Sequence, residues 1–202
     1  WWVDLQPIIN RVYSPKNPPD VSRRFYLNQP VASADSWITA PEWAGALDLE
    51  KEVQPGDLIT LGFDGSRSRA HGVTDATALI GCRVSDGHVF QLGVWEQPES
   101  WIGDESWRVP VSLVEAAVRE AFDAYQVAGF YADPAKWETY IDGWEAEYGK
   151  DLPVKSTRTN PIEWWMTGGR SGLIVRALEQ FRSAVIDNDM THGGAGVLSR
   201  HV

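Results

Sequence analysis

The chain has 202 residues, one cysteine and a formal net charge of −10 at pH 7. This length fits one well-cored domain, the lone Cys82 excludes an intramolecular disulfide and a multi-cysteine zinc site, and the charge excludes a broad basic surface. No stretch approaches the roughly 18 apolar residues of a membrane span, and no signal peptide is evident, so we expect a soluble intracellular protein without a membrane partner.

The first 57 residues contain seven prolines, which break any long periodic pattern. We expect an N-terminal arm or linker here, irregular and packed on the body that residues 58–202 form. Within the arm, residues 21–29 predict a short helix and residues 37–47 supply apolar anchors. We interpret the start on Trp1-Trp2 as a chain excised from something larger.

Residues 58–66 begin the regular part of the chain. This apolar run follows Pro55-Gly56-Asp57 and ends on Asp64, directly before Gly65-Ser66, so it predicts a buried strand with a carboxylate at its end. A polar loop follows at residues 67–74. Strands predicted at residues 75–84 and 88–96, joined by a turn, complete an antiparallel meander.

The second half of the chain predicts helices alternating with strands. A capping box of Ser112 and Glu115 and an apolar residue every third or fourth position indicate a helix at residues 110–127. The strand after it, residues 128–132, again ends on a carboxylate, Asp133. The remaining predictions are a helix at 135–148, a fifth strand at 152–156, a mostly helical segment at 162–186 and a polar tail at 187–202.

This order of elements predicts an α/β fold, with a mixed five-stranded sheet flanked by helices in the ribonuclease H-like arrangement. In that topology the first strand is central, and the strand after the first helix lies parallel beside it. Asp64 and Asp133 are therefore expected at the same edge of the sheet. Taken alone, Asp64 before a glycine is also an ordinary turn cap.

Two carboxylates at one edge predict a metal site. They repel each other unless a cation neutralises them, and hard oxygen ligands favour Mg²⁺ or Mn²⁺. The chemistry that uses such a pair is phosphodiester hydrolysis by two ions roughly 3.5–4 Å apart. Candidates for further ligands are Asp75, Asp187 and Asp189, with His192 as a ligand or proton carrier. A loop cap is the favoured interpretation of Asp75, solvated helix ends explain Asp187 and Asp189, and a plain loop residue is the favoured interpretation of His192.

Basic residues in the predicted loops are candidates for contacts with DNA phosphates. These residues are Arg67, Arg69, Lys155, Arg158, Arg170 and Arg176. About half of them are expected to balance nearby acids instead.

Several motifs in this order resemble the C-terminal nuclease half of the large terminase subunits of tailed bacteriophages. They are Arg24-Phe25-Tyr26-Leu27-Asn28-Gln29, Trp37 and Trp43, Gly62-Phe63-Asp64-Gly65-Ser66, Asp75-Ala76-Thr77-Ala78-Leu79, Tyr131-Ala132-Asp133-Pro134 and the closing segments from Thr191-His192-Gly193-Gly194 to Arg200-His201-Val202. Each motif is weak alone, but their order and spacing span nearly the whole chain.

The resemblance implies a Mg²⁺- or Mn²⁺-dependent endonuclease that cuts concatemeric viral double-stranded DNA during genome packaging. It implies Asp64 as the metal ligand on the first strand and Asp133 as the acid on the fourth. The portal and the small terminase subunit are the implied partners, in the cytoplasm of the infected bacterium. The family's last acid usually follows the histidine-glycine segment, so the third ligand lies after Val202 or is Asp187 or Asp189.

The full family pattern includes an N-terminal packaging ATPase, and this sequence lacks its motif. No Gly-x-x-x-x-Gly-Lys-Ser/Thr motif occurs, so we expect no ATP hydrolysis by this chain. A junction resolvase or transposase-like nuclease would need a DNA-binding appendage that we do not see. A sugar-kinase-like phosphate loop would need a duplicated core. The alternative from another class is a catalytically silent module that docks on DNA, portal or small terminase subunit.

Overall fold

The computed structural model describes residues 6, 9, 37–66, 69–70, 73–98, 100 and 107–201. The chain divides into two compact units, Trp1–Pro41 and Glu42–Val202. The helix predicted at residues 21–29 and the candidate Arg67 lie outside the described residues. Residues 42–57 belong to the second unit, whose fold follows. No helix within the described ranges is long and apolar enough to cross a membrane.

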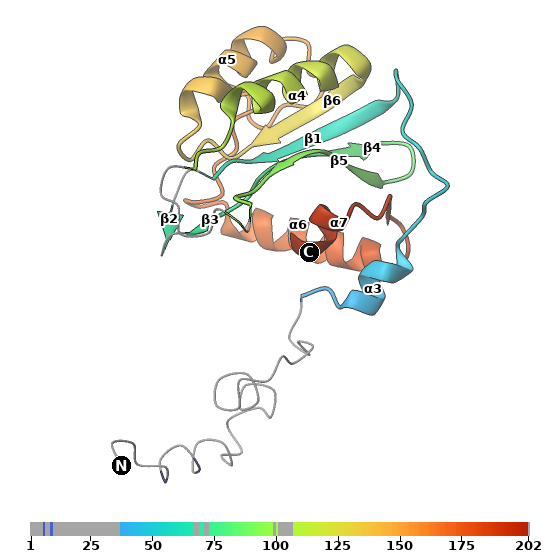
Figure 1. Cartoon of the computed structure of the whole chain (residues 1–202). Coiled ribbons are helices and arrows are strands. Elements are labelled where there is room, and N and C mark those ends of the chain that lie inside the picture. The colour runs from blue at the N-terminus through green and yellow to red at the C-terminus, as the bar shows by residue number, and fades with distance from the viewer. Residues whose placement is uncertain are drawn as a thin grey trace. The chain divides into compact units, whose positions relative to one another are not determined.

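A five-stranded mixed sheet forms the centre of the second unit (Figure 1). Its strands are β1 (Leu58–Asp64), β4 (Thr77–Arg83), β5 (His88–Trp95), β6 (Gln126–Ala132) and β7 (Thr191–His192). They lie in the order β6-β1-β4-β5-β7, with β1, β4 and β5 antiparallel, β6 parallel to β1 and β7 parallel to β5. The predicted meander and the parallel neighbour of its first strand are confirmed.

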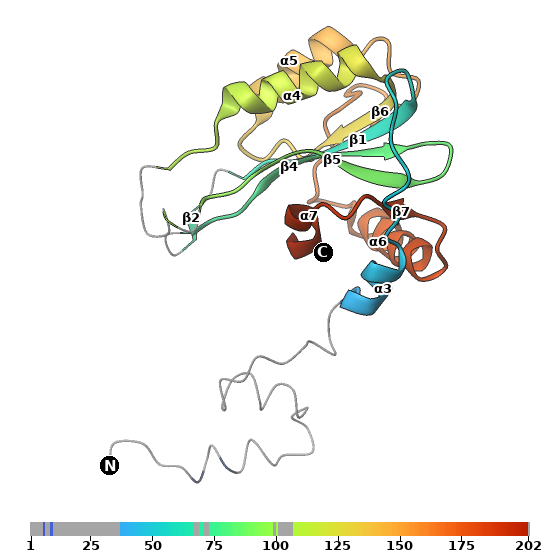
Figure 2. The same ribbon diagram turned by 45° about the vertical axis from the view of Figure 1, so that its right-hand side comes forward.

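Helices cover both faces of this sheet. Helices α4 (Val111–Ala124) and α5 (Glu138–Tyr148) lie on one face, and α6 (Ser171–Ile186) and α7 (Gly196–His201) lie on the other (Figures 1 and 2). The predicted α/β class and ribonuclease H-like arrangement are therefore confirmed. Helices α4 and α5 begin and end within a few residues of the bounds predicted for them.

The core lies between the sheet and the face formed by α4 and α5. Along β1 the side chains alternate, so Ile59, Leu61 and Phe63 are buried and turn toward these helices. Phe63 packs edge-on against both Trp137 and Trp144, with ring centroids 5.1 Å away in each case. The other face is covered more loosely, because Val185 is the only buried residue of α6.

The predicted fifth strand at residues 152–156 is wrong in its position. Only Val154 pairs there, through an isolated bridge to Gly129 on the free edge of β6, because the chain then turns away between Thr157 and Asn160. The fifth strand is β7, which lies in the segment predicted as a polar tail. Likewise, the helix predicted from residue 162 begins only at Ser171.

Shorter elements occupy segments predicted as loops or arm. Strands β2 (Arg69–Ala70) and β3 (Val73–Thr74) pair antiparallel within the segment predicted as a polar loop. Helix α3 (Ala40–Gly45) carries Trp43, which contacts β7, and Ala46 and Asp48 after it form backbone hydrogen bonds with His192. Single-turn elements of this kind carry little periodic signal in a sequence.

His192 of β7 has a structural role. Its ring is buried and stacks on Trp43, with centroids 3.9 Å apart and planes at 7°. Its Nε2 lies 2.8 Å from the carbonyl oxygen of Trp43, and its Nδ1 lies 3.1 Å from the backbone nitrogen of Gly194. Both ring nitrogens are therefore used, Nε2 as donor and Nδ1 as acceptor. The expectation that His192 acts as a metal ligand or proton carrier does not fit this packing.

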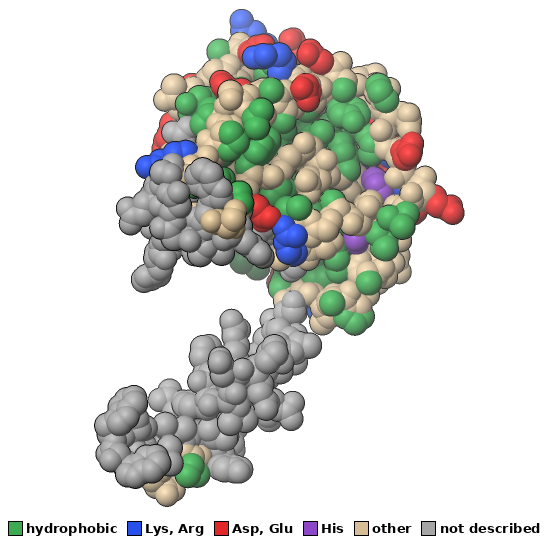
Figure 3. All heavy atoms as spheres, viewed as in Figure 1, with side chains coloured by type: hydrophobic (Ala, Val, Ile, Leu, Met, Phe, Trp, Pro, Cys, Tyr) green, Lys and Arg blue, Asp and Glu red, His purple; other side chains and the backbone are tan. Residues whose placement is uncertain are grey.

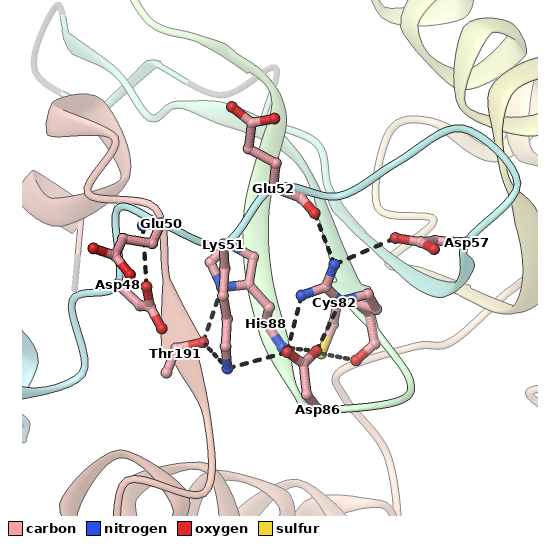
Figure 4. A network of polar contacts seen from close by, with 10 residues as sticks. Asp48, Glu50, Lys51, Glu52, Asp57, Cys82, Asp86, His88 and Thr191 are labelled. Carbon is pink, nitrogen blue, oxygen red and sulfur yellow. Dashed lines mark hydrogen bonds and ion pairs between the residues drawn. The ribbon is translucent and has the colours of Figure 1, made fainter.

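A polar network fixes the opposite end of the sheet from Asp64 (Figure 4). Arg83 donates two hydrogen bonds to Asp86, at 2.8 and 2.9 Å, and one each to Asp57 and the carbonyl of Glu52. Lys51 forms an ion pair with Asp86 at 3.0 Å. The two cations hold the pKa of Asp86 well below its usual range, chiefly through the hydrogen bonds from Arg83.

His88 joins this network to β7, and its titration makes the stability of the folded chain dependent on pH. Its buried Nδ1 lies 2.9 Å from Thr191 Oγ1, which also accepts a hydrogen bond from Lys51. Burial and the charges of Arg83 and Lys51 lower the pKa of His88 below 6.5, whereas Asp86 and Asp48 oppose this shift.

We expect the free energy of unfolding to fall as the pH decreases below about 6.5. Below this pH the His88 imidazole binds a proton more readily in the unfolded chain than in the folded chain, because folding lowers its pKa. Chemical denaturation of the wild type and His88→Asn between pH 8 and pH 5 tests this. The fall should be smaller in the variant, and equal falls would show that His88 does not contribute.

Candidate metal centre

Asp64 ends β1 on the face of the sheet opposite the core. It shares this face with Gly62, because alternate residues of a strand point the same way. The chain after it is fixed by buried Thr77, whose Oγ1 accepts a hydrogen bond from the Ser66 amide at 3.0 Å and lies 3.3 Å from the Ser66 carbonyl oxygen. The carboxylate is thus held at a rigid strand end.

Asp133 follows β6 and lies beside this strand end. Its backbone N–H donates a hydrogen bond to the carbonyl of Phe63 at 3.1 Å, which extends the parallel pairing of β1 and β6 to the acidic residues. Its Oδ1 accepts a hydrogen bond from the amide of Ala135 at 3.3 Å. The predicted convergence of Asp64 and Asp133 at one edge is therefore what the structure shows.

The electrostatics of Asp64 show that Asp75 also lies close. Burial among the surrounding residues raises the pKa of Asp64 above 3.8, and the negative charges of Asp133 and Asp75 raise it further. Asp75 lies two residues before β4, the strand that pairs Ala78 with Asp64. The fold therefore brings Asp133 and Asp75 near enough to Asp64 for their charges to oppose its ionisation.

Asp64 and Asp133 fit a magnesium or manganese ion that takes few of its ligands from the protein. Across the described ranges, no three His, Cys, Asp or Glu side chains converge closely enough to hold a metal by themselves. Mg²⁺ in proteins is often held by one or two carboxylates, with water and substrate phosphate completing its octahedron. Asp64 and Asp133 would supply those two carboxylates, and Asp75 a nearby charge.

The structure does not bring Asp187 and Asp189 to this centre. Asp187 caps the C-terminus of α6, and the backbone oxygen of Asp189 lies against Gly87 in the turn between β4 and β5. That turn follows Arg83, which pairs with Ile59 at the beginning of β1. Five residues of β1, about 16 Å at the usual strand rise, separate that end from Asp64.

The candidate DNA-binding residues remain predictions. Lys155 and Arg158 are exposed on the loop beyond the free edge of β6, and Arg69 lies in β2. Arg176 is exposed on α6, and its Nε donates a hydrogen bond to the carbonyl of Gly172. On the face seen in Figure 3, Lys and Arg side chains are scattered among acidic ones rather than gathered into a patch.

Three residues near the acids were not predicted to act together. Tyr131 and Trp164 stack on each other and line the cleft that Asp64 and Asp133 also line. The guanidinium of Arg170 lies over the Trp164 ring. The sequence places the aromatic residue Tyr131 on the strand that leads to Asp133, which is the signal that was available. The packing of Trp164 against it depends on tertiary structure.

Gly65 is required by the packing beneath Asp64. A Cβ atom at this position would lie 2.3 Å from Trp137 Nε1 and 2.8 Å from Phe63 Cε1. Trp137 is fully buried and cannot withdraw. We expect Gly65→Ala to lower the free energy of unfolding by about 1–3 kcal/mol, the usual cost of overpacking.

Urea denaturation measures this effect, and Gly62→Ala is the matched control. A Cβ at Gly62 meets nothing within 4 Å, so that variant should unfold like the wild type. Equal stabilities of the Gly65 and Gly62 variants would contradict the packing described.

Asp64 also costs stability when no cation is bound. Because its pKa is raised, the folded chain loses stability as the pH rises through the window between 3.8 and that raised value. We expect Asp64→Asn to raise the melting temperature at pH 7 in EDTA, with the gain vanishing near pH 4. Differential scanning calorimetry tests this, with the exposed Asp142→Asn as control. A lower melting temperature for Asp64→Asn at pH 7 would contradict the raised pKa of Asp64.

The chain is similar in sequence to two curated phage proteins. No protein-family profile matches the chain. Over 212 aligned residues the chain is 39% identical to the gene 13 protein of Mycobacterium phage L5 and 38% identical to that of Mycobacterium phage D29, covering 100% of this chain and 34% of each relative. The chain thus spans about a third of the length of these curated relatives.

A solved structure shares the fold. The crystal structure of the HK97 bacteriophage large terminase superposes with a TM-score of 0.50 and 18% sequence identity, over 83% of this chain and 36% of the terminase. The strand order and the paired acids define an α/β protein of ribonuclease H-like fold. The resemblance to the nuclease part of a large terminase, which the motifs indicated, is confirmed in the fold.

Proposed function

We propose that this chain is the metal-dependent endonuclease part of a phage protein that cuts concatemeric double-stranded DNA during genome packaging. The observation that carries the proposal is the hydrogen bond from the Asp133 amide to the Phe63 carbonyl, which fixes Asp133 beside Asp64 at the end of two parallel strands. The fold of a large terminase and the similarity to two mycobacteriophage proteins support the packaging role.

The proposed chemistry divides between the ions and the protein. Bound Mg²⁺ or Mn²⁺, two ions in the full mechanism, would supply charge neutralisation of the scissile phosphate and an activated water. Asp64 and Asp133 would hold such ions at a fixed place, because the two residues lie at the ends of paired strands. Burial raises the pKa of Asp64 first, and repulsion by Asp133 and Asp75 raises it further. A bound cation would offset both effects, so cation binding and ionisation of Asp64 would favour each other.

The proposed partners are double-stranded DNA, the phage portal and the small terminase subunit, in the cytoplasm of the infected bacterium. A second candidate function is a catalytically silent module that docks on DNA, the portal or the small subunit. It is favoured by one observation, that no three metal-ligating side chains converge in the part of the chain that is described.

Plasmid cleavage separates the two functions. We expect supercoiled plasmid to be nicked and then linearised with Mn²⁺ or Mg²⁺, and left intact with EDTA. A folded chain that binds DNA but leaves the plasmid intact under every metal condition would favour the docking module.

A further inference from the structure

Thr77, the first residue of β4, places a hydroxyl in the hydrophobic core. The side chain is fully buried and lies on the same face of β4 as Leu79, which packs in the core against α4 and α5. Across the described ranges, the other buried polar side chains are His88 and His192. Burial of a hydroxyl costs free energy unless it forms hydrogen bonds, and valine would fill the same space without that cost. The hydrogen bonds of Thr77 therefore indicate its role.

Both hydrogen bonds of this hydroxyl go to the backbone of one residue, Ser66. Thr77 Oγ1 accepts a hydrogen bond from the Ser66 amide at 3.0 Å and donates one to the Ser66 carbonyl oxygen at 3.3 Å. The backbone pairing of β1 with β4 reaches Asp64, opposite Ala78. The Thr77 side chain thus continues the connection between the two strands beyond the end of β1. We call this contact between Thr77 and Ser66 the Thr77 clamp.

The Thr77 clamp joins the two chain segments that carry Asp64 and Asp75. Ser66 is two residues after Asp64, and Thr77 is two residues after Asp75. The clamp fixes these segments against each other although its two residues are 11 positions apart in the sequence. The two acids are close enough for the charge of Asp75 to raise the pKa of Asp64.

The backbone around Asp64 is therefore held from both neighbouring strands. On the side of β6, the Asp133 amide donates a hydrogen bond to the carbonyl of Phe63 at 3.1 Å. On the side of β4, the Thr77 clamp fixes both polar groups of the Ser66 backbone. A ligand held in this way is pre-organised, so less free energy is lost in ordering it when a cation binds.

We propose that Thr77 is a positioning residue of the metal centre. Its hydroxyl fixes the Ser66 backbone and so sets the place of the Asp64 carboxylate relative to that of Asp75, which determines how tightly a divalent cation binds and how fast DNA is cut. Thr77 itself touches neither cation nor DNA, because it is fully buried on the core face of the sheet. The inference rests on the nuclease function proposed above.

The test compares Thr77→Val and Thr77→Ser with the wild type. Valine keeps the shape of threonine and removes both hydrogen bonds, whereas serine keeps the hydroxyl. We expect Thr77→Val to weaken Mn²⁺ binding in calorimetry and to slow plasmid nicking by about 10-fold or more, the usual effect of removing a group that supports a metal ligand. Thr77→Ser should restore most of both. The affinity for DNA in EDTA should be the same in all three proteins.

Two further measurements separate positioning from a general loss of stability. Val118 is fully buried on α4, so Val118→Ala weakens the core without changing the Thr77 clamp and should bind Mn²⁺ and cut DNA like the wild type. Hydrogen exchange of the Ser66 amide reports on the clamp without any metal. Exchange should be faster in Thr77→Val than in the wild type, Thr77→Ser or Val118→Ala.

A double-mutant cycle tests the link between Thr77 and Asp75. Asp75→Asn should weaken Mn²⁺ binding in the wild-type background and should have a smaller effect when Thr77→Val is also present, because the Asp75 carboxylate is then no longer held in place. Equal effects of Asp75→Asn in the two backgrounds, including no effect in either, would disprove this link.

The outcomes distinguish this inference from the nuclease function. If the wild type and Thr77→Val bind Mn²⁺ equally tightly and cut at equal rates, the positioning role is overturned and the nuclease function stands. A loss of Mn²⁺ affinity in Val118→Ala as large as that in Thr77→Val would also overturn it, since lost stability would then explain both. A folded wild type that neither binds Mn²⁺ nor cuts DNA would overturn the nuclease function and, with it, the role of Thr77.

Discussion

Asp64→Asn and Asp133→Asn are each expected to reduce metal-dependent DNA cleavage by about 100-fold or more. The two carboxylates lie at the ends of paired strands, where the Asp133 amide bonds to the Phe63 carbonyl. Asparagine keeps the shape of the side chain and removes the charge that attracts a cation. Several kcal/mol of transition-state stabilisation by the ion are then lost, which corresponds to two or more powers of ten in rate.

The measurement is the initial rate of plasmid nicking with Mn²⁺. Asp187→Asn and Asp189→Asn are the matched controls, because they lie at the opposite end of the sheet from Asp64. Both controls should cut at nearly the wild-type rate. A loss of activity in either control equal to that in Asp64→Asn would show that a distant acid takes part, as the sequence resemblance allowed.

Trp137→Ala is expected to lower the free energy of unfolding by about 3–5 kcal/mol, the usual cost of removing a buried tryptophan. Trp137 is fully buried, packs edge-on against Phe63 and lies under Gly65, so it joins the core to the chain that carries Asp64. The resulting cavity would loosen this strand end as well.

Urea denaturation followed by circular dichroism measures the loss. Trp165→Ala provides the control, since that side chain is 37% exposed and should change stability by well under half as much. If both tryptophan variants unfolded at the same urea concentration, the support of Asp64 by Trp137 would be disproved.

The sheet was predictable from the sequence wherever a strand had a strong alternating or apolar pattern. β1, β4 and β5 have seven or eight residues each, and their turn signals fixed the meander. Asp64 and Asp133 followed from this order, because a strand that enters after a helix crossover lies parallel to its neighbour. Two residues at β7 give no such pattern, and its place depends on packing between His192 and Trp43.

The cleft was not predictable for a related reason. The segment after residue 162 contains enough apolar residues to resemble one long helix, but the backbone amide of Trp164 bonds instead to the carbonyl of Ala132 at the edge of β6. This tertiary hydrogen bond keeps Trp164 out of a helix and places its ring beside Tyr131. Helix α6 begins only later, at Ser171. Local propensity cannot show a contact between residues 32 positions apart.

The most direct test of the central claim is Mn²⁺ binding by isothermal titration calorimetry without DNA. Asp64 and Asp133 form a divalent-cation site in this account, so the wild type should bind Mn²⁺, and Asp64→Asn and Asp133→Asn should each weaken that binding strongly, whereas Asp187→Asn should not. Undiminished Mn²⁺ binding by both Asp64→Asn and Asp133→Asn would contradict the metal centre.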